Sequence, residues 1–380
     1  MTSTDYFSDE HRLVRDSVKR FVEREILPHV DEWEEAGSFP IELYRKAGDA
    51  GILGIGHPEQ VGGAGTDLFM KIVAVEEILR CTSGGLAASL GSLDIGLPPI
   101  IHFGSEALQQ RIVPDVLAGR KIQCLAITEP GGGSDVAALR TQARRDGDHY
   151  VVNGSKTFIT SGVRADYYTV AVRTGEPGHK GVSLLLVEKG TPGFSVGRNL
   201  KKMGWWASDT AELFFEDCRV PVENLIGEEN AGFYAIMANF QNERLQLAVT
   251  ANTTAQIALE ETIAYVKQRQ AFGQSLSDFQ TLRHRIAEMA TRVEVSREYT
   301  YRVAAKMQAG ENAIKDVSMA KNMATTTSDY VTYQAVQLFG GMGYMRESVV
   351  ERLYRDNRIL SIGGGTYEIM NEVIAKTLGL

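Results

Sequence analysis

The 380-residue chain has few cysteines, no long apolar run and no excess of basic charge. Its three cysteines, Cys81, Cys124 and Cys218, are odd in number and far apart, which argues against a disulfide framework or a zinc knuckle. No apolar run approaches the length that crosses a bilayer. The net charge of −8 disfavours a nucleic-acid partner, which normally binds a basic stripe. We therefore expect buried, reduced thiols and neither a membrane nor a nucleic-acid role.

Signals of targeting and of several common enzyme classes are also missing. The stretch Met1–Glu10 carries Asp5, Asp9 and Glu10 but no basic or apolar run, so we expect a cytoplasmic, bacterial protein. The glycine pairs at 54–56 and 341–343 lack the third glycine and the βαβ context of a dinucleotide fold. No phosphate-binding loop, nucleophile elbow or helical His pair occurs. Rossmann enzymes, generic hydrolases and resident metals are thereby disfavoured.

Hydrophobic periodicity divides the chain into three parts. Helical spacing dominates the first third, for example from Phe7 to Val30 and from Phe69 to Arg80. Short β-rich segments follow, and long helical patterns return after Gly227. We predict a mainly α protein with a central β domain: an N-terminal helical domain over 1–122, a β barrel or sandwich over 123–231, and a C-terminal four-helix bundle over 232–380.

A polar, glycine-rich loop directly follows a β-like run at residues 126–135, ending in Ser134 and Asp135. Composition alone is equally compatible with a capped hairpin connection and with a loop that approaches a flat ligand closely. The string resembles the first signature of the acyl-CoA dehydrogenase family at each constrained position. That resemblance implies that Thr128 contacts the flavin ring of FAD and that Ser134 lies near the thioester arm.

A second stretch, from Gln337 to Asp356, resembles the other signature of that family. The resemblance implies contacts to the ADP half of FAD in a neighbouring subunit by Gln337, Gly340, Gly341, Arg269, Phe272 and Gln280. It also assigns Thr366 and Glu368 to cofactor binding. Without the family, Arg269 would more often be a surface or helix-end charge, and a solvated face would explain the three arginines 352, 355 and 358 equally well.

The segment 156–162 resembles the family strand beside the isoalloxazine ring, which makes Phe158 and Thr160 flavin-contact candidates. An aromatic residue in a β-rich segment is otherwise usually part of the core. The similarity continues through residues 202–217 and so covers nearly the whole chain. Trp205 and Trp206 add bulk there, and we expect them either to shape the acyl channel or to lie at a surface or subunit contact.

Desaturation of a thioester needs a carboxylate base for the α-proton and donors on the carbonyl. Many family members carry the base in the loop before the last helix, but here that position is Gly364. Long-chain and isovaleryl-type members place it on the first C-terminal helix, before an arginine, and the matching pair is Glu243 and Arg244. We predict Glu243 as the base and assign Arg244 to substrate binding. The rivals, Glu368 and Asp209, resemble helix or turn caps.

The resemblance implies an FAD-dependent acyl-CoA dehydrogenase that converts a medium, long or branched acyl-CoA to trans-2-enoyl-CoA. In this family the backbone N–H at Gly364 and the flavin ribityl 2'-hydroxyl polarise the thioester carbonyl. Electron-transfer flavoprotein is the expected acceptor, and a homotetramer built as a dimer of dimers is the expected assembly. A flavin oxidase or monooxygenase on the same scaffold, and a non-catalytic flavin- or CoA-binding homologue, remain as alternatives.

Overall fold

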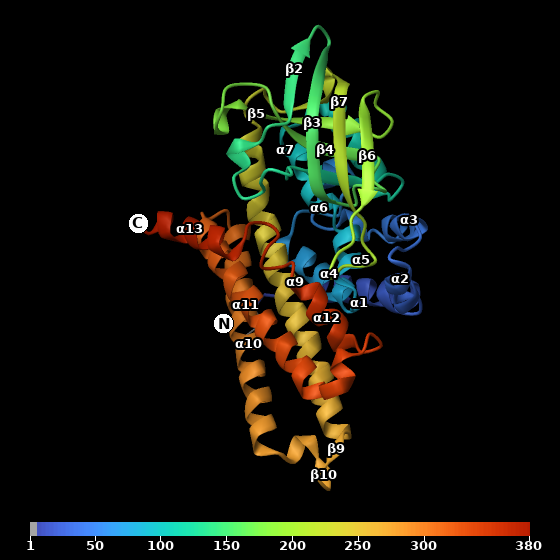
Figure 1. Cartoon of the computed structure of the whole chain (residues 1–380), viewed down its shortest axis with the longest axis vertical. Helices are drawn as coiled ribbons and strands as arrows, with labels where there is room; N and C mark the ends of the chain where they lie inside the picture. The colour runs from blue at the N-terminus through green and yellow to red at the C-terminus, as the bar shows by residue number, and fades with distance from the viewer. Residues whose placement is uncertain (1–5) are drawn as a thin grey trace.

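The structure is a computed structural model that describes residues 6–380, so Asp5 of the N-terminal stretch lies outside the described residues. Three parts follow one another along the chain, and the predicted helical, β, helical order is confirmed. In Figure 1 the β domain lies at the top, and the N-terminal helices lie below it beside the C-terminal helices. The first part holds α1 (Asp9–Phe21), α2 (Val30–Ala36), α3 (Glu42–Asp49), α4 (Leu68–Leu79), α5 (Gly84–Leu90), α6 (Leu93–Gly96), α7 (Pro98–Phe103) and α8 (Glu106–Leu117).

The first helical pattern is shorter than the predicted span from Phe7 to Val30. Ser8 caps α1, which ends at Phe21, and a π-helical turn covers Val22–Ile26. The amide of Leu27 then bonds the carbonyl of Val22 at 2.9 Å. Pro28 has no N–H to continue the ladder and disfavours a helical residue before it, so the helix stops there.

The middle domain is a mixed sheet in the order β6-β7-β3-β2-β4-β5-β8, with β1 parallel to β4. Its strands are β1 (Gln123–Ala126), β2 (Gln142–Asp146), β3 (His149–Thr160), β4 (Tyr167–Arg173), β5 (Val182–Glu188), β6 (Phe194–Asn199), β7 (Thr210–Pro221) and β8 (Leu225–Ile226). β4 and β5 are buried along almost their whole length, as apolar runs covered on both faces should be. The polar β2 was not predicted, because its sequence lacks apolar alternation.

The last domain consists of α9 (Gly232–Gln268), α10 (Gln280–Gln308), α11 (Ile314–Phe339), α12 (Val349–Asn357) and α13 (Tyr367–Thr377). The hairpin β9 (Gln270–Ala271) and β10 (Gln274–Ser275) joins α9 to α10 at the end of the molecule opposite the β domain (Figure 1). α11 packs on α9, α10, α12 and α13, which makes it the centre of the bundle. We propose to divide the chain at residues 122 and 231, where helices give way to strands and then return.

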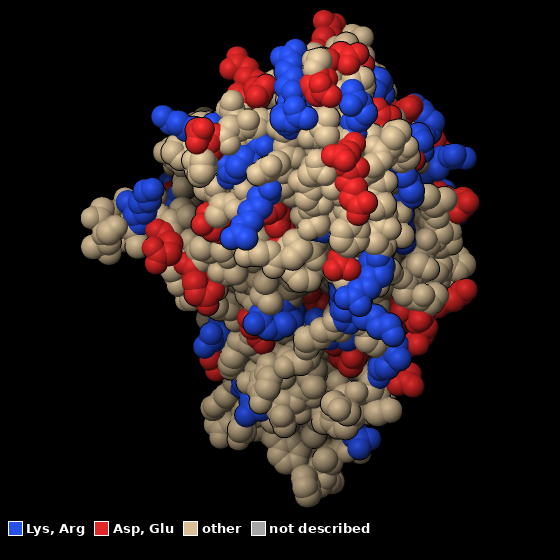
Figure 2. Space-filling view, turned by 45° about the horizontal axis from the view of Figure 1, so that its top comes forward, with Lys and Arg blue, Asp and Glu red and all other residues tan. Residues whose placement is uncertain are grey.

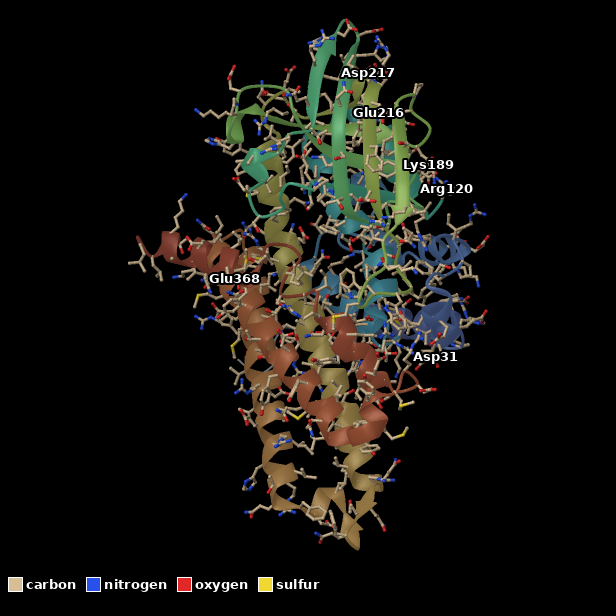
Figure 3. The ribbon with its side chains drawn as sticks, in the orientation of Figure 1. Asp31, Arg120, Lys189, Glu216, Asp217 and Glu368 are labelled. Atoms are coloured by element: carbon tan, nitrogen blue, oxygen red, sulfur yellow. The ribbon has the colours of Figure 1, made fainter. Side chains whose placement is uncertain are left out.

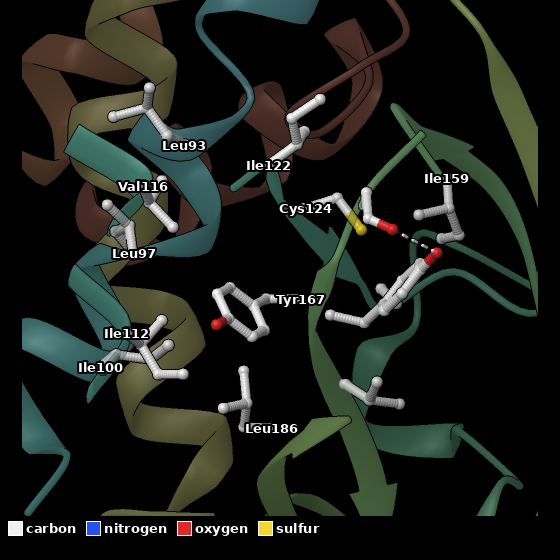
Figure 4. Close-up of a cluster of buried hydrophobic side chains, with 14 of the residues drawn as sticks. Leu93, Leu97, Ile100, Ile112, Val116, Ile122, Cys124, Ile159, Tyr167 and Leu186 are labelled. Atoms are coloured by element: carbon white, nitrogen blue, oxygen red, sulfur yellow. Dashed lines mark hydrogen bonds between the residues drawn. The ribbon is translucent and has the colours of Figure 1, made fainter. Parts of the chain in front are cut away.

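One apolar core joins the N-terminal helices to the sheet (Figure 4). Leu97 and Ile100, which flank the start of α7, and Ile112 of α8 are fully buried in it together with Leu186 of β5. Burying each such side chain contributes roughly 1.5–3 kcal/mol. The two domains therefore form a continuous platform against which α9 packs.

Two of the arginines expected on a solvated face are buried instead, so that interpretation is wrong for them. Arg355 pairs with Glu34 of α2 at 3.2 Å, and Arg352 pairs with Asp31, which is labelled in Figure 3. The guanidinium of Arg355 also lies 3.7 Å from the ring centroid of Trp206. These contacts tie α12 to the N-terminal and β domains, whereas Arg358 is exposed.

Acidic and basic side chains are interspersed on the face drawn in Figure 2. Within residues 6–380 no single helix is long and apolar enough to cross a membrane. One pair of helices, Gly84–Leu90 and Leu93–Phe103, has together the length and composition of a membrane span, but the pair is bent by 45°. In the same residues no group of three or more His, Cys, Asp or Glu side chains is placed to hold a metal ion.

Candidate active site

A cavity of about 910 Å³ lies where the three domains meet. Its walls come from α4 to α6, from β1 and the loop after it, from α9, and from the loop before α13. The volume is at the upper end of the usual range for ligand sites. Eight of the predicted site residues line it: Thr128, Ser134, Phe158, Thr160, Glu243, Arg244, Gly364 and Thr366.

The glycine-rich loop after β1 is braced by a buried ion pair. Lys156 of β3 donates to Glu129 at 2.8 Å and to the carbonyl of Ile127 at 3.1 Å. Glu129 also accepts from the amides of Arg140 and Thr141 at 2.6 and 2.8 Å. Burial would raise the pKa of Glu129, but Lys156 and the hydrogen bonds outweigh it and lower that pKa. The ionised carboxylate therefore holds both ends of the loop that carries Thr128 and Ser134.

Phe158 is turned out of the sheet into the cavity. The pairing of β3 with β7 shifts register between Lys156 and Ile159, and Phe158 adopts a left-handed backbone with φ 59°. Its side chain is 68% exposed, so the alternative that it belongs to the core is wrong. A bulky residue in this conformation carries strain that surrounding structure must support. The bulge thus presents an aromatic ring beside Thr160.

Glu243 of α9 lies next to Gly364 in the cavity wall. A Cβ atom added at Gly364 would lie 3.4 Å from the Glu243 Oε1 atom. The Oε2 atom of Glu243 is buried and has no hydrogen-bond partner among residues 6–380. Burial raises the pKa of Glu243 to about 7, against the lowering effects of Arg244 and Lys321. A carboxyl group without a partner and with a pKa near neutrality is suited to accept a proton.

Two cations stand beside this carboxylate. Arg244 is 5% exposed, and burial lowers its pKa although Glu243 opposes that effect. Lys321 of α11 is fully buried and donates to the carbonyl of Gly365 at 2.7 Å. It therefore anchors the loop of Gly364 and stabilises the ionised form of Glu243. Sequence reasoning missed Lys321, because a lysine in a helix usually lies in solvent.

The remaining predicted residues do not line this cavity. Arg269, Phe272, Gln280, Gln337, Gly340, Gly341 and Glu368 are all exposed in the single chain. Phe272 forms the tip of the β9–β10 hairpin with φ 54° and is 96% exposed. At 1.5 Å per residue, the 26 steps along α9 from Glu243 to its C-cap Arg269 span about 39 Å. Six of these residues thus form a second group near the C-terminal end of α9, whereas Glu368 lies at the start of α13, next to Thr366 of the cavity.

The rival bases have other roles in this arrangement. Asp209 accepts from Arg164 Nε at 2.6 Å and from the amide of Val163 at 2.7 Å. Glu368 lies at the start of α13 (Figure 3), where its own backbone N–H and Thr366 lower its pKa. Neither side chain lines the cavity.

The sequence matches the acyl-CoA dehydrogenase N-terminal domain over residues 8–120, the middle domain over 124–218 and the C-terminal domain over 230–379. It is 43% identical over 376 residues to the mitochondrial long-chain specific acyl-CoA dehydrogenase of Sus scrofa, covering 98% of this chain and 87% of that protein. A probable acyl-CoA dehydrogenase from Mycobacterium abscessus superposes with a TM-score of 0.97 at 54% identity, over 98% and 100% of the two chains. An acyl-CoA dehydrogenase of Bacillus anthracis complexed with FAD superposes with a TM-score of 0.93 at 32% identity, over 100% of this chain and 69% of that one.

Proposed function

Because the chain belongs to the acyl-CoA dehydrogenase family of oxidoreductases, we propose that it desaturates a medium, long or branched acyl-CoA to the trans-2-enoyl-CoA with FAD as cofactor. We further propose the long-chain and isovaleryl-like subtype, in which the base is carried by α9. Ala87, Ala88 and Gly91 are small residues that line the cavity and leave room for such chains.

The relation between Glu243 and Gly364 carries this proposal. A Cβ atom at position 364 would overlap Leu247 Cδ1 at 2.4 Å and would lie 3.4 Å from Glu243 Oε1, so a side chain there would start beside the Glu243 carboxylate. Gly364 has φ +63°, a conformation that disfavours any other residue. A base anchored on α9 and a base anchored in the loop would therefore address the same point in the cavity.

The residues present fit FAD. Phe158 is a strained, exposed aromatic ring at the cavity wall, and Thr128 and Thr160 supply hydroxyl groups beside it. Such a surface suits a flat, apolar ring with polar edges. When bound, FAD supplies the acceptor for the hydride that leaves the β-carbon.

The chain's own residues handle the proton and the carbonyl. Glu243 takes the α-proton, for which its unpartnered Oε2 atom is free within the described residues. In residues 6–380 the N–H of Gly364 makes no hydrogen bond, so it can donate to the thioester oxygen. Lys321 holds the loop that carries this donor, through Gly365. Arg244 keeps a positive charge next to the base and contributes to substrate binding.

We propose that the second residue group completes the FAD site of a neighbouring subunit in a homotetramer. The span of about 39 Å along α9 is too long for one dinucleotide to contact both groups in one chain. The exposed Phe272 and Arg269 supply an aromatic ring and a cation, which suit an interface and a pyrophosphate. Electron-transfer flavoprotein is the proposed acceptor.

Anaerobic mixing of the purified yellow protein with acyl-CoAs tests this function. Bleaching of the flavin with formation of enoyl-CoA is expected, followed by slow reoxidation in air. Rapid reaction with oxygen would instead indicate an oxidase or monooxygenase. Absence of bleaching with every acyl-CoA would indicate a non-catalytic homologue and contradict the proposal.

A further inference from the structure

A second, smaller cavity of about 190 Å³ adjoins the active-site cavity. It lies between the N-terminal helices and α9, and both cavities are lined by Lys71, Val75, Asp94 and Gln246. Lys71 lies on α4 and Asp94 on α6, so their side chains stand at the boundary between the two spaces. Gly364 lines the same active-site cavity as this boundary, so an acyl chain held at Gly364 shares one space with Lys71 and Asp94.

The boundary is charged, although it is buried. Lys71 Nζ lies 2.7 Å from Asp94 Oδ1, and His57 Nε2 lies 3.1 Å from the same oxygen. His57 and Asp94 are 4% and 7% exposed. Burial would raise the pKa of Asp94, but Lys71 and His57 outweigh it, so that pKa lies below its usual value. Asp94 is therefore a carboxylate at neutral pH.

Several polar groups around the smaller cavity have unused hydrogen-bonding capacity. Within residues 6–380, Asp94 Oδ2 accepts no hydrogen bond. In the same residues, the side-chain amides of Asn242 and Gln246 form no hydrogen bond with any side chain. Lys71 Nζ uses one of its three donors on Asp94. The pKa of His102 is lowered mainly by burial and to a smaller extent by His57, so this nearby ring is neutral at neutral pH. The site thus offers a strong donor and a strong acceptor side by side.

We infer that this polar boundary is a subsite for a hydroxyl group on the distal part of the acyl chain, an inference that rests on the proposed function. A hydroxyl both donates and accepts, so it can bond Asp94 Oδ2 and Lys71 Nζ together. A hydrocarbon end would displace water from these charged groups and return no hydrogen bonds. A terminal carboxylate would bring a second negative charge against Asp94.

The test compares kcat/KM for dodecanoyl-CoA and hexadecanoyl-CoA with their ω-hydroxy and ω-carboxy analogues. The wild-type enzyme should prefer the ω-hydroxy substrate by at least about tenfold at one of these lengths, as expected for hydrogen bonds to charged groups. In Lys71→Met/Asp94→Asn the ratio should fall to about one. Asp94→Asn alone keeps the shape of the side chain and should also lower the kcat/KM ratio of the ω-hydroxy to the unsubstituted substrate.

The matched control is Lys306→Met/Asp316→Asn, which makes the same changes in a 3.1 Å pair between α10 and α11 that lines neither cavity. It should keep the wild-type ratio. If the enzyme oxidises the unsubstituted substrates and butanoyl-CoA but shows no ω-hydroxy preference at either length, the subsite is overturned and the proposed function stands. A preference for the ω-carboxy analogues would overturn the hydroxyl assignment. Failure of every thioester, butanoyl-CoA included, would overturn the proposed function itself.

Discussion

Moving the carboxylate from α9 to the loop, as Glu243→Gly with Gly364→Glu, should restore part of the activity that Glu243→Gly removes. A general base contributes about 10²- to 10⁴-fold, so the single variant should lose that factor. A side chain at 364 starts 3.4 Å from the present Glu243 Oε1 atom, which puts its carboxylate within reach of the same α-carbon. The left-handed backbone there, φ +63°, costs an L residue about 1–2 kcal/mol.

Recovery should be incomplete for a second, steric reason. The new Cβ would lie 2.4 Å from Leu247 Cδ1, so this leucine must move. We expect the double variant to regain at least about tenfold of the lost rate. Adding Leu247→Ala should raise the rate further, because it removes the overlapping atom.

The assay is the rate of anaerobic flavin bleaching by a saturating acyl-CoA, measured on protein with equal FAD content. The control is Glu243→Gly with Gly365→Glu, since a Cβ at Gly365 points at Met370 Cε, 2.6 Å away, and meets no part of Glu243. This control should show no recovery. The shared position of the two carboxylates would be refuted if the Gly364→Glu and Gly365→Glu double variants had equal rates of flavin bleaching. It would also be refuted if Gly364→Glu gave no gain in a folded, FAD-loaded protein.

Three other perturbations have defined outcomes. The pKa of Glu243 rises from 4.5 to about 7 on folding. Its contribution to the free energy of unfolding is therefore fully present below about pH 4.5, where the group is protonated in both states, and is lost as the pH rises through 7. Glu243→Gln should therefore resist urea better than wild type at pH 8, by up to about 3 kcal/mol, and an equal or lower midpoint would argue against the raised pKa. Lys321→Met removes a cation that favours ionised Glu243, so the midpoint of flavin reduction against pH should move upward, and an unchanged midpoint would speak against the coupling. Arg269→Ala should weaken FAD retention and tetramer formation together, by roughly 1.5–3 kcal/mol, as measured by flavin release on dilution and by sedimentation; full flavin retention at low concentration would count against the assignment.

The fold was largely predictable because the elements are long and strongly periodic. α9, α10 and α11 show helical spacing over many turns, whereas β2 is short and polar and gave no signal. The break in the first helix depends on a π-helical turn before Pro28, which periodicity does not report. The buried charges of α12 depend on partners in α2, more than three hundred residues away in sequence.

The candidate site was predictable only where residues belong to a recognisable motif. Glu243 could be proposed from its pairing with Arg244 and from the missing carboxylate at Gly364. Lys321 and Asp94 lie in helices and belong to no recognisable motif. Lys321 bonds the carbonyl of Gly365, and Asp94 pairs with Lys71, so both roles depend on tertiary neighbours. Such contacts are set by packing between elements, and no spacing rule along the chain encodes them.

The central claim is that Glu243 removes the α-proton of a bound acyl-CoA, and the rate of anaerobic flavin reduction by Glu243→Gln tests it most directly. The substitution keeps the size of the side chain and removes its basicity. A variant that binds FAD and acyl-CoA but reduces its flavin at least about 10²- to 10⁴-fold more slowly than wild type is the predicted result. Reduction at the wild-type rate would contradict the claim.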